Sequence, residues 1–368
     1  MTTATAGPGV RPAERDAMER ALALAGTDRL VLGPNPRVGC VLLDGDGVTL
    51  AEGFHRGAGT PHAETVALTN ARAALGPDAL RGATAVVTLE PCAHTGRTGP
   101  CAQALVDAGV RRVVFAQRDP NPAAAGGADV LGAAGIDVVH AQPVMDADLM
   151  ARVHDLNRVW AAATTLGRPY VTWKVALTLD GRSAAPDGTS RWITTAAARR
   201  DVHLLRTRVD TVLVGTGTLA DDDPALTARD VPGPQPLRAV MGLRDVPATA
   251  RVAAPGPDGA PGVHLRTRDP RAALEDLWQR ERRHVLLEGG ATLAAAFWRA
   301  GLVDEVVAYV APVLLGAGTP AVADLGITTI TGAARLDVTD VALIHPDPHD
   351  DGPDETNVRL TLRPRKEH

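Results

Sequence analysis

The spacing of one histidine, one glutamate and two cysteines constrains the fold of this chain more than any other feature. His62 and Glu64 lie two residues apart, and Cys92 and Cys101 follow with eight residues between them. An imidazole and two thiolates form a zinc ligand set, and one ion can hold them only if the fold brings the three segments together. Three protein ligands leave a fourth position for water, whereas a structural zinc is normally closed by four. This arrangement is typical of zinc deaminases, in which a nearby Glu carries protons and is not a ligand.

Local signals place these side chains at the ends of secondary-structure elements. Thr60 and Pro61 predict the start of a helix, with Thr60 as its N-cap. Residues 84–89 predict a strand that ends just before Cys92, and Cys101 opens another helix. Helix positions two apart do not share a face, so Glu64 must turn back over the metal, for which the first turn leaves room. Simple zinc deaminases place two residues between the cysteines. In this chain a longer loop must therefore bring the second thiol back to the metal.

The first half of the chain predicts an α/β sheet with helices on its faces. A helix is expected at residues 14–26, a hairpin at 38–43 and 49–55, and further strands at 112–116 and 136–139 with helices between them. A chain of 368 residues exceeds one typical core, so two domains are expected. The expected organisation is a disordered tail at 1–13, a zinc domain at 14–145, a connecting helix at 146–167 and a second domain at 168–365.

Composition excludes several classes of partner. The net charge is −5 and aromatic residues are 3% of the chain, which argues against nucleic acid and for a small-molecule substrate. No apolar run approaches the length of a membrane span, and the N-terminus has no signal-peptide pattern. The cysteines are three in number, Cys40, Cys92 and Cys101, which favours metal or catalytic use in a reducing cytoplasm over disulfides.

The second half predicts alternating strands and helices with two glycine-rich turns. Strands are expected at 170–176, 211–215, 237–240, 284–288 and 305–310, and closing strands within 343–363 around an acidic, Pro-rich hairpin tip. Residues 215–220 fit a GxGxxA dinucleotide fingerprint, but the acids and the proline at 221–224 stop a long helix and argue against a Rossmann fold. Gly289 and Gly290 separate a strand from a helix at 292–300, which predicts a phosphate-binding turn.

Motifs in both halves carry a family resemblance. GPNPRVGC, GFH, PHAE, LEPCAHTGRTGPC and DPNP, followed by WKVALTLDGR, TSRWIT, VLVGTGTLADDDPALTAR and LLEGGATLAAAF, resemble the bifunctional riboflavin-biosynthesis deaminase/reductase family from about residue 14 to 363. The resemblance implies a cytidine-deaminase-like α/β/α domain and a dihydrofolate-reductase-like α/β domain. It also implies zinc and NADPH as cofactors, a phosphorylated pyrimidine as substrate and a cytoplasmic location, and we expect a homo-oligomer. Two departures from the family pattern are Gly99 in the cysteine loop and Gly242-Leu243 after a strand.

The resemblance also implies roles for individual residues. The residues themselves indicate His62, Cys92 and Cys101 as the zinc ligands and Glu64 as a catalytic residue, and Lys174 and Asp222 are our own candidates for catalysis near the ribose. Cofactor contacts are implied for Ala176, Trp192, Thr218, Asp222, Gly290, Ala291, Thr292, Leu293, Ala294, Ala295 and Ala296. Substrate contacts are implied for Asn35, His55, His94, Asn121, Ser190, Arg206, Leu226, Arg229 and Glu288. Arg206 and Arg229 suit a ribose phosphate, because guanidinium pairs with phosphate through two hydrogen bonds.

Two alternatives stand beside this interpretation. One is a zinc deaminase of another nucleobase or nucleotide, joined to a nucleotide-binding domain; the long cysteine spacing and the large second half argue against it. The other is a structural zinc module with no enzymatic activity. The ordinary alternative for the arginines is a solvated helix face, and for Trp192 a place in the core.

Overall fold

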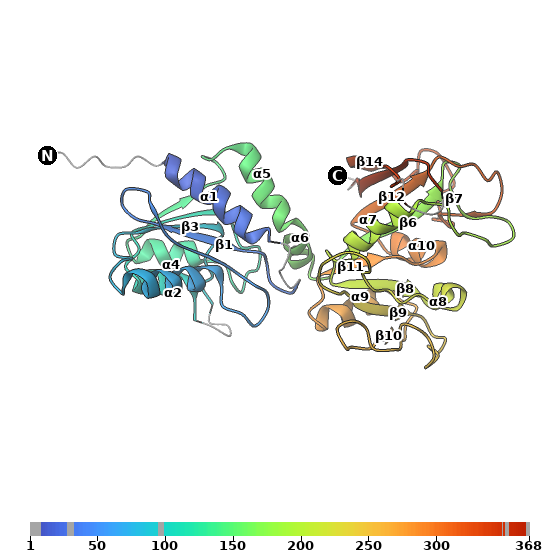
Figure 1. Ribbon diagram of the computed structural model, residues 1–368, viewed down its shortest axis with the longest axis horizontal. Helices are drawn as coiled ribbons and strands as arrows, with labels where there is room; N and C mark the ends of the chain where they lie inside the picture. Colours follow the sequence, from blue (N-terminus) through green and yellow to red (C-terminus); the bar gives the residue numbers. More distant parts are fainter. Residues whose placement is uncertain (1–8, 28–32, 95–98, 348, 350–352, 366–368) are drawn as a thin grey trace. The chain divides into compact units, whose positions relative to one another are not determined.

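The fold is described from a computed structural model of the chain, which describes residues 9–27, 33–94, 99–347, 349 and 353–365. The chain divides into two compact units, Met1–Gly167 and Arg168–His368, shown in Figure 1. Within the described part of the chain, no helix is long and apolar enough to cross a membrane.

The N-terminal unit is built on a mixed sheet with the strand order β2-β1-β3-β4-β5. β1 runs antiparallel to β2 and β3, and β3, β4 and β5 are parallel. Its elements are α1 (Pro12–Ala25), β1 (Gly39–Leu43), β2 (Thr49–Phe54), α2 (Ala63–Leu75), β3 (Thr84–Leu89), α3 (Cys101–Asp107), β4 (Arg112–Gln117), α4 (Gly127–Ala133), β5 (Asp137–His140), α5 (Ala147–Leu156) and α6 (Arg158–Leu166).

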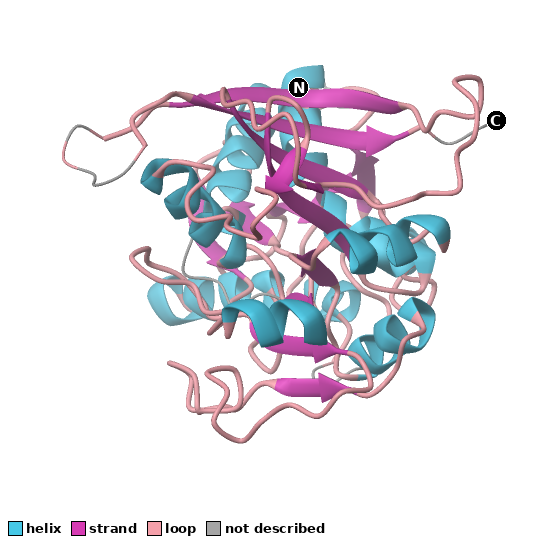
Figure 2. Ribbon diagram, turned by 90° about the vertical axis from the view of Figure 1, so that its right-hand side faces the viewer, coloured by secondary structure: helices cyan, strands magenta, loops and turns pink. Residues whose placement is uncertain are grey.

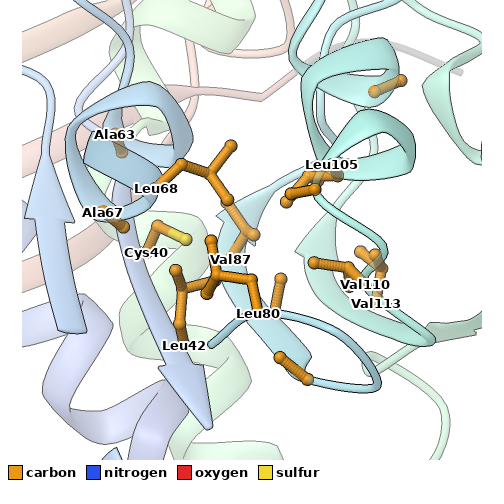
Figure 3. Packing of buried hydrophobic residues seen from close by; sticks show 14 of the residues in the cluster. Cys40, Leu42, Ala63, Ala67, Leu68, Leu80, Val87, Leu105, Val110 and Val113 are labelled. Atoms are coloured by element: carbon orange, nitrogen blue, oxygen red, sulfur yellow. The ribbon is translucent and has the colours of Figure 1, made fainter. Parts of the chain in front are cut away.

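Helices cover both faces of this sheet, because alternate strand residues point to opposite sides. Cys40 and Leu42 face α2, α3 and α4, and Figure 3 shows them packed with Leu68 and Leu105. Val41, on the other face, packs in the cluster that contains residues of α1 and α5. The predicted α/β/α arrangement is therefore confirmed.

The structure differs from two expectations at the ends of this unit. α1 begins at Pro12, inside the expected tail, of which residues 1–8 lie outside the described part of the chain. The single helix expected at 146–167 is wrong, since α5 and α6 are separate helices on either side of Asn157. The buried amide of Asn157 accepts a hydrogen bond from Arg37 N at 2.8 Å and donates one to Arg37 O at 2.7 Å. The break between the two helices thus coincides with a long-range contact that helical periodicity does not reveal.

The C-terminal unit contains a larger sheet with the order β10-β9-β8-β11-β6-β12-β15-β14, in which β14 and β15 form the antiparallel hairpin expected around the acidic tip (Figures 1 and 2). A small ribbon pairs β13 with β7. The elements are β6 (Tyr170–Thr178), β7 (Arg182–Ala184), α7 (Ala196–Arg206), β8 (Thr211–Gly215), α8 (Thr216–Asp222), β9 (Leu237–Met241), β10 (Val263–Leu265), α9 (Pro270–Gln279), β11 (His284–Leu287), α10 (Ala291–Arg299), β12 (Glu305–Ala311), β13 (Thr319–Pro320), β14 (Leu336–Ile344) and β15 (Asn357–Pro364).

Helices also pack on this sheet. Leu274 of α9 and Phe297 of α10 are buried with Leu287 of β11 in the largest cluster of the unit. Val202 of α7 packs with Tyr309 in a separate cluster. The strands from β10 to β6 are parallel to their neighbours, so their carboxyl ends meet at one edge of the sheet. Ligands bind at such an edge in open α/β sheets. The short β7, β10 and β13 were missed, because two or three residues carry no usable alternation, and β14 begins at Leu336, before the closing segment expected at 343–363.

Candidate functional site

The fold brings the three predicted zinc ligands together in the N-terminal unit. His62 Nδ1 lies 3.2 Å from Cys101 Sγ and 3.6 Å from Cys92 Sγ, and all three ligand atoms lie within 4.8 Å of one another. Zn–S bonds of about 2.3 Å and Zn–N bonds of about 2.0 Å separate nitrogen from sulfur by roughly 3.6 Å in a tetrahedron. The donor types and their separations therefore fit a zinc ion.

Each ligand is held at the end of an element, although one helix start differs from the expectation. His62 itself is the N-cap of α2, and Thr60 instead donates from its hydroxyl to Gly57 O. A residue at the cap has extended backbone, so the imidazole of His62 and the first-turn carboxylate of Glu64 need not share a helix face. Beside them, Cys101 N donates to Cys92 Sγ at 3.4 Å, which holds the two sulfurs together at the start of α3.

A glycine permits the close packing behind the cysteines. The Cα of Gly127, at the first residue of α4, approaches the chain at Pro91 so closely that a Cβ would lie 1.6 Å from Pro91 O. Ala124, just before α4, packs against Cys92 and Cys101. The buried carboxylate of Glu90 accepts hydrogen bonds from Asp119 N and Ala128 N, which fixes the same loop. Sequence reasoning missed Glu90, whose only signal was its position at a strand end.

The electrostatics of the cluster suit metal binding and proton transfer. Hydrogen bonds from Cys101 and from His62 lower the pKa of Cys92, which favours the thiolate that a zinc ion requires as a ligand. The same pairing, with burial, raises the pKa of Cys101. Glu64 is buried, and burial raises the pKa of its carboxyl to about 7. A carboxyl that titrates near neutral pH can both accept and return a proton.

Asn35 and His55 form a pair beside the zinc ligands. His55 Nδ1 lies 3.0 Å from Pro61 O, which can only accept, so Nδ1 carries the proton. His55 Nε2 is then the acceptor for Asn35 Nδ2 at 3.0 Å. The rings of His55 and His62 meet edge to face with centroids 5.4 Å apart. Desolvation lowers the pKa of His55, which keeps this neutral tautomer.

The loop that carries Asn35 is anchored by the two helices that replace the expected connecting helix. Asn157 bonds the backbone of Arg37 on one side of the loop. Trp160 Nε1 donates to Pro34 O at 3.0 Å. The residue-level geometry of the Asn35–His55 pair therefore depends on α5 and α6, a role that no sequence motif indicated.

The other two residues expected to contact the pyrimidine lie in different settings. His94 is exposed, in the loop that follows Cys92. Asn121 accepts a hydrogen bond from Ala123 N, so its side-chain oxygen is used in a turn. Its backbone N donates to Asp119, whose pKa burial raises to about 6. A Cβ at Gly99 would meet no atom within 4 Å among the residues that the structure describes.

In the C-terminal unit the fold brings Glu288, Arg206 and Lys174 together. Arg206 donates from Nε to Glu288 Oε1 at 2.7 Å and from Nη2 to Oε2 at 2.9 Å, while Nη1 donates to Thr227 O. Lys174 Nζ lies 4.0 Å from Glu288 Oε2. The pKa of Glu288 is about 2, because Arg206 and Lys174 outweigh the opposing effect of burial. Burial, with Arg206 nearby, lowers the pKa of Lys174.

Arg206 is thus already engaged, whereas Arg229 is exposed. The backbone N of Arg229 donates to His203 Nδ1 at 3.2 Å, which fixes the position of this loop and leaves the guanidinium of Arg229 without a partner among the described residues. Leu226 is buried with a left-handed backbone, and Ser190 is exposed. The structure therefore offers Arg229, more than Arg206, as a free cation.

A cavity of about 550 Å³ lies at the carboxyl ends of the parallel strands. It is lined by six of the residues expected at the cofactor: Thr218, Gly290, Ala291, Thr292, Leu293 and Ala296. Ala294 and Ala295 do not line it, because α10 turns both into the core. Ala176, Trp192 and Asp222 do not line it either; Asp222 pairs with Arg191, and Arg199 stacks on the exposed ring of Trp192 at 4.1 Å.

Sequence reasoning missed the cations of this cavity. Arg244, Arg268 and Arg299 all line it, together with the carboxylate of Asp221. Arg244 and Arg268 directly follow short strands in Pro- and Gly-rich sequence. The only available signal was a cation just beyond a strand end.

Two family models match the chain, one in each unit. The model described as the cytidine and deoxycytidylate deaminase zinc-binding region matches residues 12–117, and the model described as the RibD C-terminal domain matches residues 169–348. The expected zinc-deaminase unit is confirmed by the first match, and the second match covers the C-terminal α/β unit. The zinc cluster lies within the first match, and the cavity lies within the second.

Curated relatives and solved structures match nearly the whole chain. Riboflavin biosynthesis protein RibD of Mycobacterium tuberculosis (strain H37Rv) is 46% identical over 321 residues, 85% of this chain and 89% of that protein. The RibD of Escherichia coli (strain K12) is 35% identical over 365 residues, 90% of this chain and 96% of that protein. Acinetobacter baumannii RibD, form 2, has a TM-score of 0.82 at 36% identity and covers 96% of this chain and 99% of its own.

A further solved structure is of a protein whose name gives both activities. It is the diaminohydroxyphosphoribosylaminopyrimidine deaminase/5-amino-6-(5-phosphoribosylamino)uracil reductase of Thermotoga maritima, with a TM-score of 0.78 at 31% identity, covering 96% of this chain and 99% of that chain. Sequence motifs, zinc-ligand geometry and these full-length matches agree: the chain belongs to the RibD family, the bifunctional deaminase/reductases of riboflavin biosynthesis.

Proposed function

We propose that the N-terminal unit deaminates diaminohydroxyphosphoribosylaminopyrimidine with one zinc ion held by His62, Cys92 and Cys101. The proposal rests on one observation, the convergence of these three donors beside the buried carboxyl of Glu64. When bound, zinc supplies an activated water at neutral pH. Glu64 would carry the two protons of that water in turn, the first to the ring nitrogen and the second to the departing amine, so the products are a carbonyl and ammonia.

The substrate ring is proposed to bind against the Asn35–His55 pair. Because Nε2 of His55 accepts from the amide nitrogen of Asn35, the amide oxygen of Asn35 is left to accept a hydrogen bond from a donor on the substrate ring. His94, in the loop after Cys92, and Asn121, in the turn before Ala124, are the further candidates for contacts with the ring. Because His94 is exposed, its imidazole is accessible to a ligand.

For the C-terminal unit, we propose reduction of 5-amino-6-(5-phosphoribosylamino)uracil with NADPH, which supplies the hydride. Hydride addition at C1 of the sugar breaks the bond from C1 to the ring oxygen, and that oxygen takes up a proton to give the ribityl chain. Lys174 and Asp222 are the candidate proton donors. Lys174 is favoured, because its lowered pKa makes it the readier donor and Asp222 is paired with Arg191.

The other residues expected at the substrate and the cofactor are proposed either to bind the phosphate or to define the shape of the site. The free guanidinium of Arg229 is proposed to hold the substrate phosphate, and Ser190 to hydrogen-bond the same molecule. Arg206 and Glu288 are proposed to shape the site through their mutual pairing, with Leu226 beside Thr227. Trp192, Ala176 and Asp222 then lie on the nicotinamide side of the cofactor, outside the cavity that holds its other parts.

We also propose a cytoplasmic homo-oligomer. The buried free thiols Cys40, Cys92 and Cys101 support a reducing compartment. Val338, Val341 and Leu343 are exposed on β14, the edge strand of the large sheet, and an exposed apolar edge strand favours association with a second chain. Light scattering of the purified protein measures the number of chains directly; a monomer at micromolar concentration would contradict this part of the proposal.

The function is tested by following ammonia and the NADPH absorbance together in one reaction with the diaminopyrimidine substrate. Ammonia should appear first and NADPH loss should follow, and a chelator should stop both because the second step needs the first product. Glu64→Gln should keep zinc and lose ammonia release, while Glu52→Gln, at an exposed pair with Arg20, serves as the matched control. Ammonia release without NADPH loss would contradict the reductase assignment, and no ammonia would contradict the deaminase substrate.

A further inference from the structure

The cavity of the C-terminal unit extends across several strand ends. Most of its lining residues lie at or shortly after the ends of four parallel strands: Gly215–Thr218 at the end of β8, Met241–Arg244 at the end of β9, Thr267–Arg268 after β10, and Gly290–Leu293 after β11. The sheet order β10-β9-β8-β11-β6 therefore runs along the cavity and continues to the strand that carries Lys174. At a strand spacing of about 4.8 Å, this edge measures roughly 19 Å from β10 to β6.

The two ends of this edge differ in chemistry. Lys174, on β6, and Glu288, after β11, lie at one end, where the substrate is proposed to react. The N-terminus of α10, capped only by the backbone of Gly290, follows β11 and suits a phosphate. Arg244 and Arg268 lie at the other end, after β9 and β10. A dinucleotide with its nicotinamide over β6 places its adenosine half over β9 and β10.

Arg244 and Arg268 are cations with no assigned task. Neither guanidinium has a hydrogen-bond or ion-pair partner in the part of the chain that the structure describes. The third arginine of the cavity, Arg299, already donates to Asp324 O. Among the described residues, Asp221 is the one carboxylate that lines the cavity, so this lining carries net positive charge.

A glycine brings the Arg244 loop close to the start of α8. Gly242 has a φ of +144°, and a Cβ there would lie 2.6 Å from Thr216 Oγ1. A side chain therefore does not fit at position 242 in this chain. Arg244, two residues on, is the nearest polar side chain of the loop that lines the cavity.

The arginines and the α10 N-terminus are too far apart to share one phosphate. Arg244 follows a strand two places from β11 and Arg268 a strand three places from it, so their loops lie about 10 Å and about 14 Å away along the edge. A dinucleotide that binds both the α10 N-terminus and the two arginines therefore carries a second anionic group, on its adenosine half. Guanidinium groups bind such a phosphate through paired, charge-assisted hydrogen bonds.

We propose that Arg244 and Arg268 bind the 2′-phosphate of the cofactor and so determine the preference of this chain for NADPH over NADH. The proposal rests on the proposed function, because it takes the nicotinamide cofactor to lie in this cavity. It assigns the preference to two side chains that follow β9 and β10, separate from the residues near the substrate.

The test is calorimetric binding of NADP⁺ and of NAD⁺ to the full chain, with no turnover required. Arg244→Ala and Arg268→Ala should each weaken NADP⁺ binding about tenfold and leave NAD⁺ binding unchanged, as expected for loss of one charge-assisted hydrogen-bonding partner. The double variant should lose about 100-fold if the two contacts add. Arg266→Ala is the matched control, since Arg266 is exposed near the same strand end and paired with Asp245.

Three results would overturn the subsite while leaving cofactor binding in place. The first is equal affinity of the unaltered chain for NADP⁺ and NAD⁺. The second is an equal loss of affinity for both nucleotides in the variants, which would place the arginines at the pyrophosphate that both nucleotides share. The third is an equal effect of Arg266→Ala, which would indicate a long-range effect of charge. A chain that binds neither nucleotide would overturn both the subsite and the nicotinamide assignment. Retained NAD⁺ binding in each variant shows that it is folded.

Discussion

Replacing Glu288 by Gln tests whether the buried ion cluster of the C-terminal unit stabilises the fold. The Glu288 side chain is 9% exposed and accepts two hydrogen bonds from Arg206, with Lys174 Nζ at 4.0 Å. Glutamine keeps the shape of the side chain but removes the charge. Two buried cations then face each other without a counterion, and breaking a buried pair in this way costs about 3–5 kcal/mol.

The pKa of Glu288 gives a second way to calculate the free energy of unfolding that this substitution removes. A carboxyl pKa of about 2 in the folded chain, against about 4.3 when unfolded, corresponds to roughly 3 kcal/mol in favour of the charged form. Because the folded pKa is the lower one, this stability is fully present above about pH 4.3. It is lost as the pH falls from there through about 2. The two routes agree on a loss of about 3 kcal/mol at pH 7.

The assay is urea unfolding followed by tryptophan fluorescence at several pH values. Of the five tryptophans, Trp173, Trp192, Trp278 and Trp298 lie in the C-terminal unit, so the signal reports mainly on that unit. Asp276→Asn, in an exposed pair with Arg280, is the control and should change stability by less than about 1 kcal/mol. A Glu288→Gln loss no larger than that of the control, or one that does not shrink below pH 4.3, would refute the reasoning.

Three further perturbations address the N-terminal unit. Glu64→Gln should leave the zinc content unchanged by metal analysis and lower the rate of ammonia release about 10²- to 10⁴-fold; an unaltered rate would contradict its proton-transfer role. Asn157→Ala removes both hydrogen bonds to the backbone of Arg37 and should cost about 1–3 kcal/mol in thermal unfolding, with slower ammonia release at full zinc content. Gly127→Ala places a methyl group against Pro91 O and should lower both thermal stability and zinc affinity, whereas Gly132→Ala, a helical glycine of α4 with open space around it, should change neither.

Local sequence was enough for the features that depend on residue type and short periods. The hairpin of β1 and β2 followed from alternation around a Gly- and Asp-rich turn, and its pairing is antiparallel as expected. The zinc ligands followed from the chemistry of one imidazole and two thiolates near element ends. These features are encoded within a few residues, so neighbouring side chains alone specify them.

Tertiary structure decided the features that depend on partners far along the chain. Asn157, at the break between α5 and α6, bonds to Arg37, 120 residues away, and Arg206 pairs with Glu288 across 82 residues. Periodicity cannot reveal such partners, because strand order and helix packing select them. The sequence by itself thus determined the chemical groups that this protein carries and most of its elements. Only the folded sheet decided which cations remain free to bind a ligand, because that depends on which carboxylates the fold brings next to each arginine.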